Sequence, residues 1–431
     1  ASDVYKRQKE ALIAAYLNET TLYVKSAYLT ALGKLDVREN LEFFKNRLQE
    51  VKNQQVPAEE QKHQGEEIRE LNEIILKTEG AKKHQFTGFQ MPHEMLLLTN
   101  REQREVTLSE VKEIGASVQR KAELHPLGVL VFSKEVIPFT KLRTYRELLF
   151  PIHTSERIPA MPHRAAELLW HSDLYGFLTE CHEGDAPFFF RLEVKSAEPK
   201  TEFVKRLGAS LEKKSDWKLA NSTTDYEIEI RLIEAKDGSF VPFLKLYSMK
   251  MKRFAYRKNA IAMSIHPATA AMLMYLAKPY LKENAQILDP CCGVGTMLIE
   301  RDILVPAREK YGIDIFGDAI DMARENAALA GEKINFIHRD YFDFKHDYKF
   351  DEIVTNMPVK GKKAKEDMDA FYARFFEKSK SLLAEDGIII MYSNEVGFVK
   401  KQLRLQPCYR LIQEYTIRKK DSYCLFIIGM K

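Results

Sequence analysis

The stretch "QILDPCCGVGT" (residues 286–296) predicts a strand that ends at Asp289 and turns through Gly293 and Gly295 into a helix beginning near Thr296. Glycines are required in such a turn when the backbone must pass close to a ligand and present free amide groups to it. A GxG pattern alone is common, so its meaning depends on the strands and polar residues further along the chain. It marks a candidate ligand-binding turn.

Two further strand-like stretches carry an acidic residue at a regular spacing. The stretch "YGIDI" contains Asp314, 25 residues after Asp289, and "INFIHRD" ends at Asp340, 26 residues after Asp314. Each interval is about one strand–helix unit, so the three carboxylates are expected at one edge of a parallel sheet, where they favour a cofactor that contains a nucleoside. A dinucleotide site would need a third glycine where Leu298 stands, whereas S-adenosylmethionine (SAM) has no pyrophosphate and needs only the shorter turn.

The segment 253–431 alternates strand-like and helix-like stretches throughout. This alternation predicts an α/β domain with a doubly wound, Rossmann-like sheet that binds ligands at the carboxyl ends of its strands. The last two stretches, "YRLIQEYTIR" and "SYCLFIIGM", predict an antiparallel terminal hairpin. A chain of 431 residues is long enough for two or three domains, and this one is expected to be the last.

Two more domains are expected upstream. Residues 1–125 are predicted to be helical, and "YVKSAYLTALGKLDVREN" within them resembles one unit of a HEAT-type repeat. Residues 126–252 are predicted to form an α+β module with a strand over 127–132, a helix over 142–149 and a β-α-β-β unit over 187–249. Such a module ahead of an α/β domain resembles the THUMP region of RNA-modifying enzymes, which implies RNA binding.

The next strand, "FDEIVTNMPV" (350–359), indicates the chemistry. It ends in Asn356-Met357-Pro358, which resembles the motif of amino-methyltransferases of the (D/N)PPY type. An exocyclic amine is a weak nucleophile because its lone pair is delocalised into the base. The Asn356 side-chain carbonyl and a backbone carbonyl near Met357 can each accept one N–H bond, which aims the lone pair at the methyl donor.

The segment 250–431 resembles one family in the order and spacing of its motifs. The stretches "LDPCCGVGTMLIE", "GIDIFGDAIDMARENAALAG" and "TNMP" are similar to the RNA methylase family of class I SAM-dependent methyltransferases, which includes tRNA guanine-N2 methyltransferases and the K/L-type ribosomal RNA methyltransferase domains. The resemblance implies methylation of an exocyclic amine of RNA, with guanine N2 of tRNA as the first expectation and ribosomal RNA as the second.

The same resemblance implies a set of site residues. Asn356, Met357 and Pro358 are the expected catalytic residues. Asp314 is expected to hold the ribose hydroxyls of SAM, and Asp340 is expected to hold the adenine amine. His266 has an alternative role, because a histidine there would equally suit the start of a helix. The expected cofactor-binding residues are Ser264, His266, Pro267, Asp289, Pro290, Cys291, Gly293, Gly295, Thr296, Asp314, Ile315, Asp340 and Tyr341.

Two positions depart from the motif and leave alternatives open. Met357 replaces the usual first proline, and Val359 replaces the aromatic residue that stacks on a flipped base. The lost stack is worth about 1–3 kcal/mol unless Phe316, Tyr341, Phe342 or another nearby ring substitutes for it. The same geometry also serves adenine N6 or a protein glutamine as acceptor, and a domain that binds SAM or RNA without turnover is a third alternative.

Two basic clusters come after the strands expected to frame the acceptor. They are Lys360, Lys362 and Lys363 after the Asn-x-Pro motif, and Lys400, Lys401 and Arg404 beyond the next strand. A charge run is ordinarily a solvated face, but cations at the reacting edge of a sheet are placed to hold phosphates. We therefore expect both clusters to contact RNA.

The amino-acid composition indicates the general class of protein. With 45% hydrophobic and 30% charged residues and a net charge of +4, the chain has the composition of a soluble globular protein, and a nucleic-acid partner fits without being required. Five cysteines without CxxC spacing favour a reduced, cytoplasmic compartment. Neither a membrane span, a leader segment nor a metal site is expected, because the sequence shows no long apolar run and no zinc-type Cys/His spacing.

Overall fold

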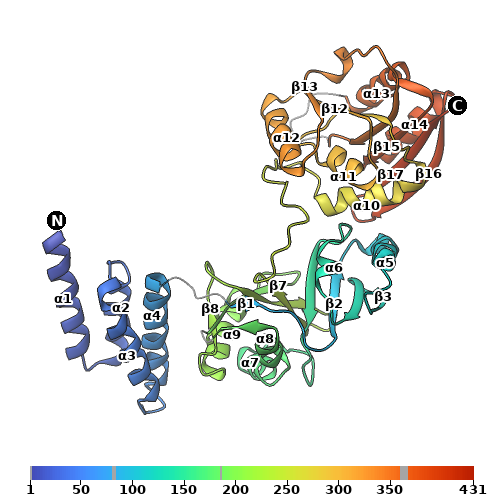
Figure 1. Ribbon diagram of the computed structural model, residues 1–431. Helices are drawn as coiled ribbons and strands as arrows, with labels where there is room; N and C mark the ends of the chain where they lie inside the picture. The colour runs from blue at the N-terminus through green and yellow to red at the C-terminus, as the bar shows by residue number, and fades with distance from the viewer. Residues whose placement is uncertain (1, 80–83, 185–186, 360–366) are drawn as a thin grey trace. The chain divides into compact units, whose positions relative to one another are not determined.

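The computed structural model describes residues 2–79, 84–184, 187–359 and 367–431 (Figure 1). The chain divides into two compact units, and each unit is assembled from two separate stretches of sequence. Unit 1 contains residues 1–87 and 152–248, and unit 2 contains residues 88–151 and 249–431. Within the described ranges, no helix combines the length and the apolar character that crossing a membrane requires.

Unit 1 begins with a cluster of helices around one core. The helices are α1 (Ser2–Asn18), α2 (Leu22–Leu32), the short η1 (Arg38–Asn40), α3 (Leu41–Asn53) and α4 (Gln61–Glu79). Tyr16, Phe44 and Leu71 are fully buried where these helices meet. A repeat array needs about three stacked helix pairs. The cluster has four α-helices in the described part, so the HEAT-like expectation is not confirmed.

The rest of unit 1 is an α+β module, which confirms the predicted β-α-β-β unit. Strand β7 (Phe188–Lys195) pairs in parallel with β8 (Leu219–Asn221) and β9 (Ile228–Glu234), and β9 forms an antiparallel hairpin with β10 (Phe240–Leu246). Gly238 takes the expected positive φ of 79° in that hairpin turn. The remaining elements are α7 (Pro162–Trp170), α8 (Leu174–Glu180), α9 (Thr201–Lys214) and the short pair β1 (Gln85–Phe86) and β6 (His182–Glu183).

The first stretch of unit 2 is an antiparallel sheet and corrects two predictions. Its strands lie in the order β3-β4-β2-β5, and residues 93–98 and 147–151 are strands although helix was predicted at both places. Apolar runs of five or six residues suit a buried strand as well as a helix, and here strand pairing decides. The elements are β2 (His93–Leu98), η2 (Arg101–Gln103), α5 (Arg104–Glu113), β3 (Lys121–His125), β4 (Gly128–Ser133), α6 (Ile137–Thr140) and β5 (Glu147–Pro151).

The second stretch of unit 2 is the predicted Rossmann-like domain with its terminal hairpin. Its sheet has the order β13-β12-β11-β14-β15-β17-β16, in which the first five strands are parallel and β17 pairs antiparallel with both β15 and β16. The strands are β11 (Gln286–Asp289), β12 (Glu309–Asp314), β13 (Asn335–His338), β14 (Phe350–Asn356), β15 (Leu383–Ser393), β16 (Tyr409–Arg418) and β17 (Tyr423–Met430). The helices are α10 (Pro267–Ala277), η3 (Lys278–Tyr280), α11 (Thr296–Leu304), α12 (Gly317–Ala330), η4 (Tyr341–Asp343), α13 (Met368–Leu382) and α14 (Val396–Leu405).

A buried ion pair joins the two stretches of unit 2. The Arg143 guanidinium donates two hydrogen bonds of 2.8 Å to the carboxylate of Glu300 on α11, and Tyr256 donates a third of 2.5 Å. The side chain of Glu300 has no exposed surface. Val106 of α5 adds an apolar contact to the core beneath α10. The antiparallel sheet is therefore fastened directly to the helix that comes after the glycine turn.

We predict that Arg143→Ala destabilises unit 2 by about 3 kcal/mol, because the buried Glu300 carboxylate would lose its charged partner. Both tryptophans of the chain, Trp170 and Trp217, lie in unit 1, so hydrogen exchange of the α11 amides is the suitable measurement. Lys278→Ala is the matched control. It removes an exposed ion pair with Glu113 of 3.7 Å and should cost less than about 1 kcal/mol. Equal exchange in both variants would contradict the prediction.

Candidate functional site

Four strand ends meet at one edge of the unit 2 sheet, because β13, β12, β11 and β14 are parallel neighbours in that order. In the ladder, Asp289 is level with Gly312, and Asp314 is level with His338. Asp314 therefore lies two residues beyond the level of Asp289, and Asp340 lies two residues beyond the level of Asp314. On the other side Leu288 is level with Ile353, which places Asn356 two residues beyond the level of Asp289. The structure thus brings the four predicted tips together.

The glycine turn is tied to the second of these tips. The Gly293 amide donates a 2.8 Å hydrogen bond to one carboxylate oxygen of Asp314, and the other oxygen accepts one of 3.0 Å from the Phe316 amide. Both glycines have positive φ, 52° at Gly293 and 82° at Gly295. A Cβ at Gly295 would lie 2.9 Å from the Phe336 ring, whereas a Cβ at Gly293 would meet no atom within 4 Å. Gly295 is needed for packing, and Gly293 borders open space.

The first strand tip holds a buried carboxyl group with spare hydrogen-bonding capacity. Oδ1 of Asp289 accepts a 3.1 Å hydrogen bond from the Cys291 amide, while Oδ2 makes none of acceptable geometry among the described residues. Burial, and then the charge of Asp314, raise the pKa of Asp289 to about 8, against the Cys291 amide and the nearby Thr355 hydroxyl. The hydroxyl of Thr296 is also buried and has no partner in the described part of the chain. Unsatisfied buried oxygens of this kind call for an explanation, and a polar ligand supplies one.

The side chains around the second and third tips differ in exposure. Ile315 and Phe316 are exposed, with 56% and 65% of their surface accessible. Asp340 is exposed as well and caps η4 by accepting a 2.9 Å hydrogen bond from the Phe342 amide. Tyr341 is buried, and its hydroxyl lies 2.9 Å from that of Ser379. Its ring is therefore part of the core and is not available to stack on a base.

In the Asn-x-Pro motif, Met357 packs in the core, whereas Asn356 lies at the end of the strand. Asn356 ends β14, level with Tyr392 on β15. Met357 donates its amide to the Tyr392 carbonyl at 2.9 Å and buries its side chain in the core. Pro358 is exposed. Because alternate residues of a strand face the same side, Asn356 lies on the sheet face of Val354, which packs in the cluster with α10.

The segment before α10 closes that face. His266 caps the helix, its Nδ1 accepting a 3.1 Å hydrogen bond from the Ala268 amide, and Pro267 is the first helical residue. Partial burial of the ring and then the positive charge of Arg146 lower the pKa of His266 to about 4, so its Nδ1 stays an acceptor at neutral pH. Ser264 accepts a 3.0 Å hydrogen bond from the Ile261 amide. The helix-start role of His266 is therefore observed.

Two lysines of the second predicted basic cluster form ion pairs within the fold. Lys360, Lys362 and Lys363 lie outside the described residues. On α14, Lys400 pairs with Glu414 at 2.9 Å and Lys401 with Asp369 at 2.6 Å, while Arg404 is exposed. The charges of these two lysines are thus partly compensated within the fold.

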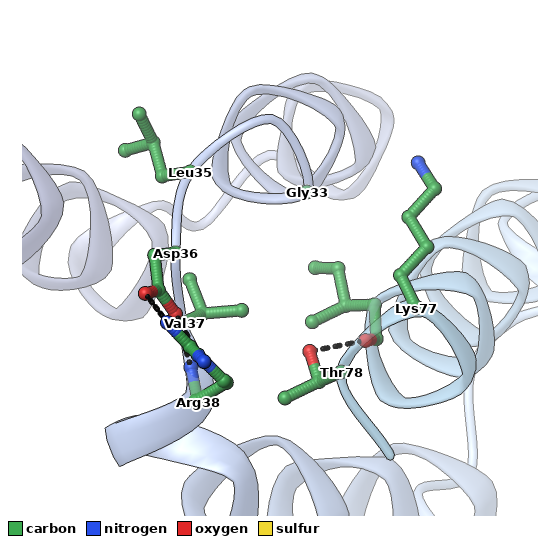
Figure 2. A pocket seen from close by; sticks show the side chains of 8 residues that line it. Gly33, Leu35, Asp36, Val37, Arg38, Lys77 and Thr78 are labelled. Atoms are coloured by element: carbon green, nitrogen blue, oxygen red, sulfur yellow. Dashed lines mark hydrogen bonds and ion pairs between the residues drawn. The ribbon is translucent and has the colours of Figure 1, made fainter. Parts of the chain in front are cut away.

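A hollow of about 280 Å³ lies in the helical cluster of unit 1, apart from this chemistry (Figure 2). Two of its charged side chains pair with each other: Arg38 donates a 2.9 Å hydrogen bond from Nε to Asp36. The Thr78 hydroxyl donates to the Ile74 carbonyl at 2.7 Å. No reactive constellation results. Across the described ranges, no three His, Cys, Asp or Glu side chains gather closely enough for a metal ion.

Two edge residues were not singled out from the sequence. Thr355 lies one residue before Asn356, and Tyr392 lies beside Asn356 on the next strand. The signal for Tyr392 was available, because "IIIMYS" is an apolar strand that ends in polar residues. Its proximity to Asn356 results from the strand order, which the sequence does not state.

The second stretch of unit 2 is similar to known methyltransferase domains. Residues 255–420 match the family model described as UPF0020: RMKL-like, methyltransferase domain. A curated relative, the tRNA (guanine(10)-N2)-dimethyltransferase of Methanothermobacter thermautotrophicus, is 33% identical over 162 residues, which cover 37% of this chain and 46% of that enzyme. The chain thus spans about half the length of this curated relative.

Solved structures share the fold over a longer part of the chain. The crystal structure of TrmN from Thermus thermophilus has a TM-score of 0.56 at 18% identity and covers 79% of this chain and 99% of its own. The structure of SMU.472 complexed with S-adenosylhomocysteine (SAH) has a TM-score of 0.58 at 14% identity and covers 79% of this chain and 98% of its own. At these identities the likeness shows the fold.

We predict that Asp289→Asn removes a pH dependence from the stability of unit 2. The folded Asp289 carboxyl keeps its proton up to about pH 8, while in the unfolded chain it keeps it only to about pH 3.8. Wild-type stability should therefore fall as the pH rises between these values, by about 2–5 kcal/mol in total, and the asparagine variant should lack this loss.

Urea unfolding of the full chain at pH 5 and pH 8, monitored by circular dichroism, checks the prediction. Asp340→Asn, at an exposed tip, should reproduce the wild-type curve. Parallel curves for wild type and Asp289→Asn would show that the Asp289 carboxyl does not titrate differently in the two states.

Proposed function

We propose, from the RMKL-like methyltransferase domain that residues 255–420 form, that this protein is a SAM-dependent RNA methyltransferase acting on an exocyclic amine. One observation carries the proposal: Asn356 ends a strand beside the tips that hold Asp289, Asp314 and Asp340. Nucleoside cofactors bind at such an edge in open α/β sheets. Guanine N2 of tRNA is the proposed acceptor, and the curated relative named for that reaction supports it.

The residues at the edge fit SAM. Within the described ranges, the buried Oδ2 of Asp289 and the hydroxyl of Thr296 make no hydrogen bond of acceptable geometry, and Gly293 borders open space where a ligand can approach the backbone. Asp314 reaches the edge with both oxygens oriented by backbone amides, and Phe316 is exposed beside it. When bound, SAM supplies an electrophilic methyl group on a sulfonium. The residues that would hold it are Asp289, Gly293, Gly295, Thr296, Asp314, Ile315 and Asp340, with Ser264, His266 and Pro267 at the rim.

The protein's part in the reaction is to orient the acceptor amine. The Asn356 side-chain carbonyl can accept one N–H bond of the amine, and the backbone beside Met357 can accept the other. Met357 suits this role because its buried side chain, and the hydrogen bond from its backbone amide to the Tyr392 carbonyl, hold the strand end in place. Fixed acceptors of this kind act without reorganisation during the reaction. The amine releases its proton to water after methylation, so no strongly basic side chain is required.

Asn356→Ala should lower kcat for methylation by about 100-fold or more while SAH binding stays within twofold of wild type, because the variant loses an acceptor that acts on the amine alone. Transfer of radiolabelled methyl from SAM is measured with total tRNA, ribosomal RNA and protein offered together. Label in protein alone would overturn the RNA assignment. Equal activity in wild type and variant would remove Asn356 from catalysis, and no activity in either would favour a binding module.

The two glycines of the turn should respond differently to alanine. Gly293→Ala should cost only about 1 kcal/mol of stability, the strain of its positive φ, because its methyl group meets no neighbour. The methyl group would enter the space where SAM is proposed, so affinity for SAH should fall at least tenfold. Gly295→Ala should cost more stability, because its Cβ would lie 2.9 Å from Phe336.

Isothermal titration calorimetry with SAH and urea unfolding separate the two effects. Wild-type affinity for SAH in Gly293→Ala would place the cofactor elsewhere.

A further inference from the structure

Two stacked aromatic residues lie on the strands that come after β14 in the sheet order. Tyr392 lies level with Asn356 on β15, and its carbonyl accepts the Met357 amide at 2.9 Å. Paired residues of adjacent strands present their side chains to the same face. The rings of Tyr392 and Tyr423 stack with centroids 4.8 Å apart and planes at 27°. A layered aromatic surface therefore begins directly beside the proposed amine-binding residue.

The outer layer of this stack is a guanidinium group. Arg418 is level with Tyr423 in the β16–β17 hairpin, and its guanidinium carbon lies 4.3 Å from the Tyr423 centroid. Asp421 fixes its orientation through an ion pair of 2.7 Å. Exposure increases outward, from 5% for Tyr392 to 45% for the Arg418 side chain. Arg418 thus presents an oriented, planar, cationic surface to solvent.

The other stretch of unit 2 adds charge and support at this place. Arg146 donates a 3.3 Å hydrogen bond to Thr269 in the first turn of α10. Burial raises the pKa of the Tyr392 phenol to about 12, and the charges of Arg418 and Arg146 both oppose this rise, so both guanidinium groups act on the same ring. Asn100 donates a 2.9 Å hydrogen bond to the carbonyl of Ile417, next to Arg418. The end of the hairpin is therefore held against a second structural element.

We propose that Tyr392, Tyr423 and Arg418 form a stacking platform for an unpaired nucleobase of the RNA, which begins beside Asn356 and ends at Arg418 on the edge strand β16. The proposal rests on the proposed function. Unpaired bases stack on aromatic rings and on arginine guanidinium planes. A planar cation above a ring attracts a base by stacking and the RNA backbone by charge. Because β15 and β17 lie between β14 and β16, this base is a different one from the acceptor base whose amine Asn356 is proposed to hold.

A fluorescent probe tests the platform independently of methylation. The probe is a single-stranded RNA dodecamer with one 2-aminopurine, whose fluorescence is quenched when the base stacks. Wild type should quench it on binding. Arg418→Ala should bind at least about fivefold more weakly and lose the quenching. Arg418→Lys keeps the charge without the plane, so it should recover part of the affinity and none of the quenching.

The matched control is Arg410→Ala. Arg410 is exposed on the same strand but lies level with Gly429, at the opposite edge of the sheet. It should bind and quench like wild type, and SAH binding within twofold of wild type in every variant shows that the cofactor site is folded. Wild-type quenching in Arg418→Ala, or full quenching and affinity in Arg418→Lys, would overturn the platform.

The methylation assay separates this proposal from the proposed function. If wild type methylates RNA and Arg418→Ala leaves KM for RNA unchanged, the platform alone is wrong. If wild type methylates no RNA but the probe is quenched as expected, the proposed function fails and the platform stands.

Discussion

The hydrogen bond from the Gly293 amide to the Asp314 carboxylate fixes the geometry on which the site depends. It joins the turn after β11 to the end of β12, so the first two strand tips cannot move independently. Parallel pairing does the same for the outer two tips, because β13 is held by β12 and β14 by β11. A parallel sheet places all its carboxyl ends at one edge. The polar residues at the ends of four separate strands therefore meet although 67 residues separate Asp289 from Asn356.

This arrangement keeps a buried carboxyl group under-satisfied. Asp289 is almost fully buried, has one carboxylate oxygen without a good partner, and lies close enough to Asp314 for their charges to repel. A fold selected for stability alone would avoid such a group, since unsatisfied buried polar atoms are unfavourable. The contrast with the Arg143–Glu300 pair is informative. There a buried carboxylate is met by three donors, and nothing is left over for a ligand.

Helix α11 begins just after the turn that comes after Asp289, and it carries Glu300. Its first residue, Thr296, has a buried hydroxyl without a partner among the described residues, and Glu300 one turn later is held by Arg143 from the antiparallel sheet of unit 2. The middle of the helix is therefore fastened to the antiparallel sheet. The β16–β17 hairpin is held in the same way, by Asn100 at Ile417. Both the turn and the stacked residues beside Asn356 are thus supported by residues 88–151, which belong to the same unit although they are distant in sequence.

The sequence by itself determined the elements of the C-terminal domain and the residues at its strand ends. Periodicity and glycine placement are local properties, and β11 ends at Asp289 and α11 begins at Thr296 as predicted. The prediction of secondary structure from the sequence failed at residues 93–98 and 147–151, because short apolar runs take the conformation that their neighbours impose. Only the tertiary structure decided that Tyr341 is buried, that Arg143 meets Glu300, and that Tyr392, Tyr423 and Arg418 stack beside Asn356. These are contacts between residues far apart in the chain, and no local pattern encodes which strands become neighbours.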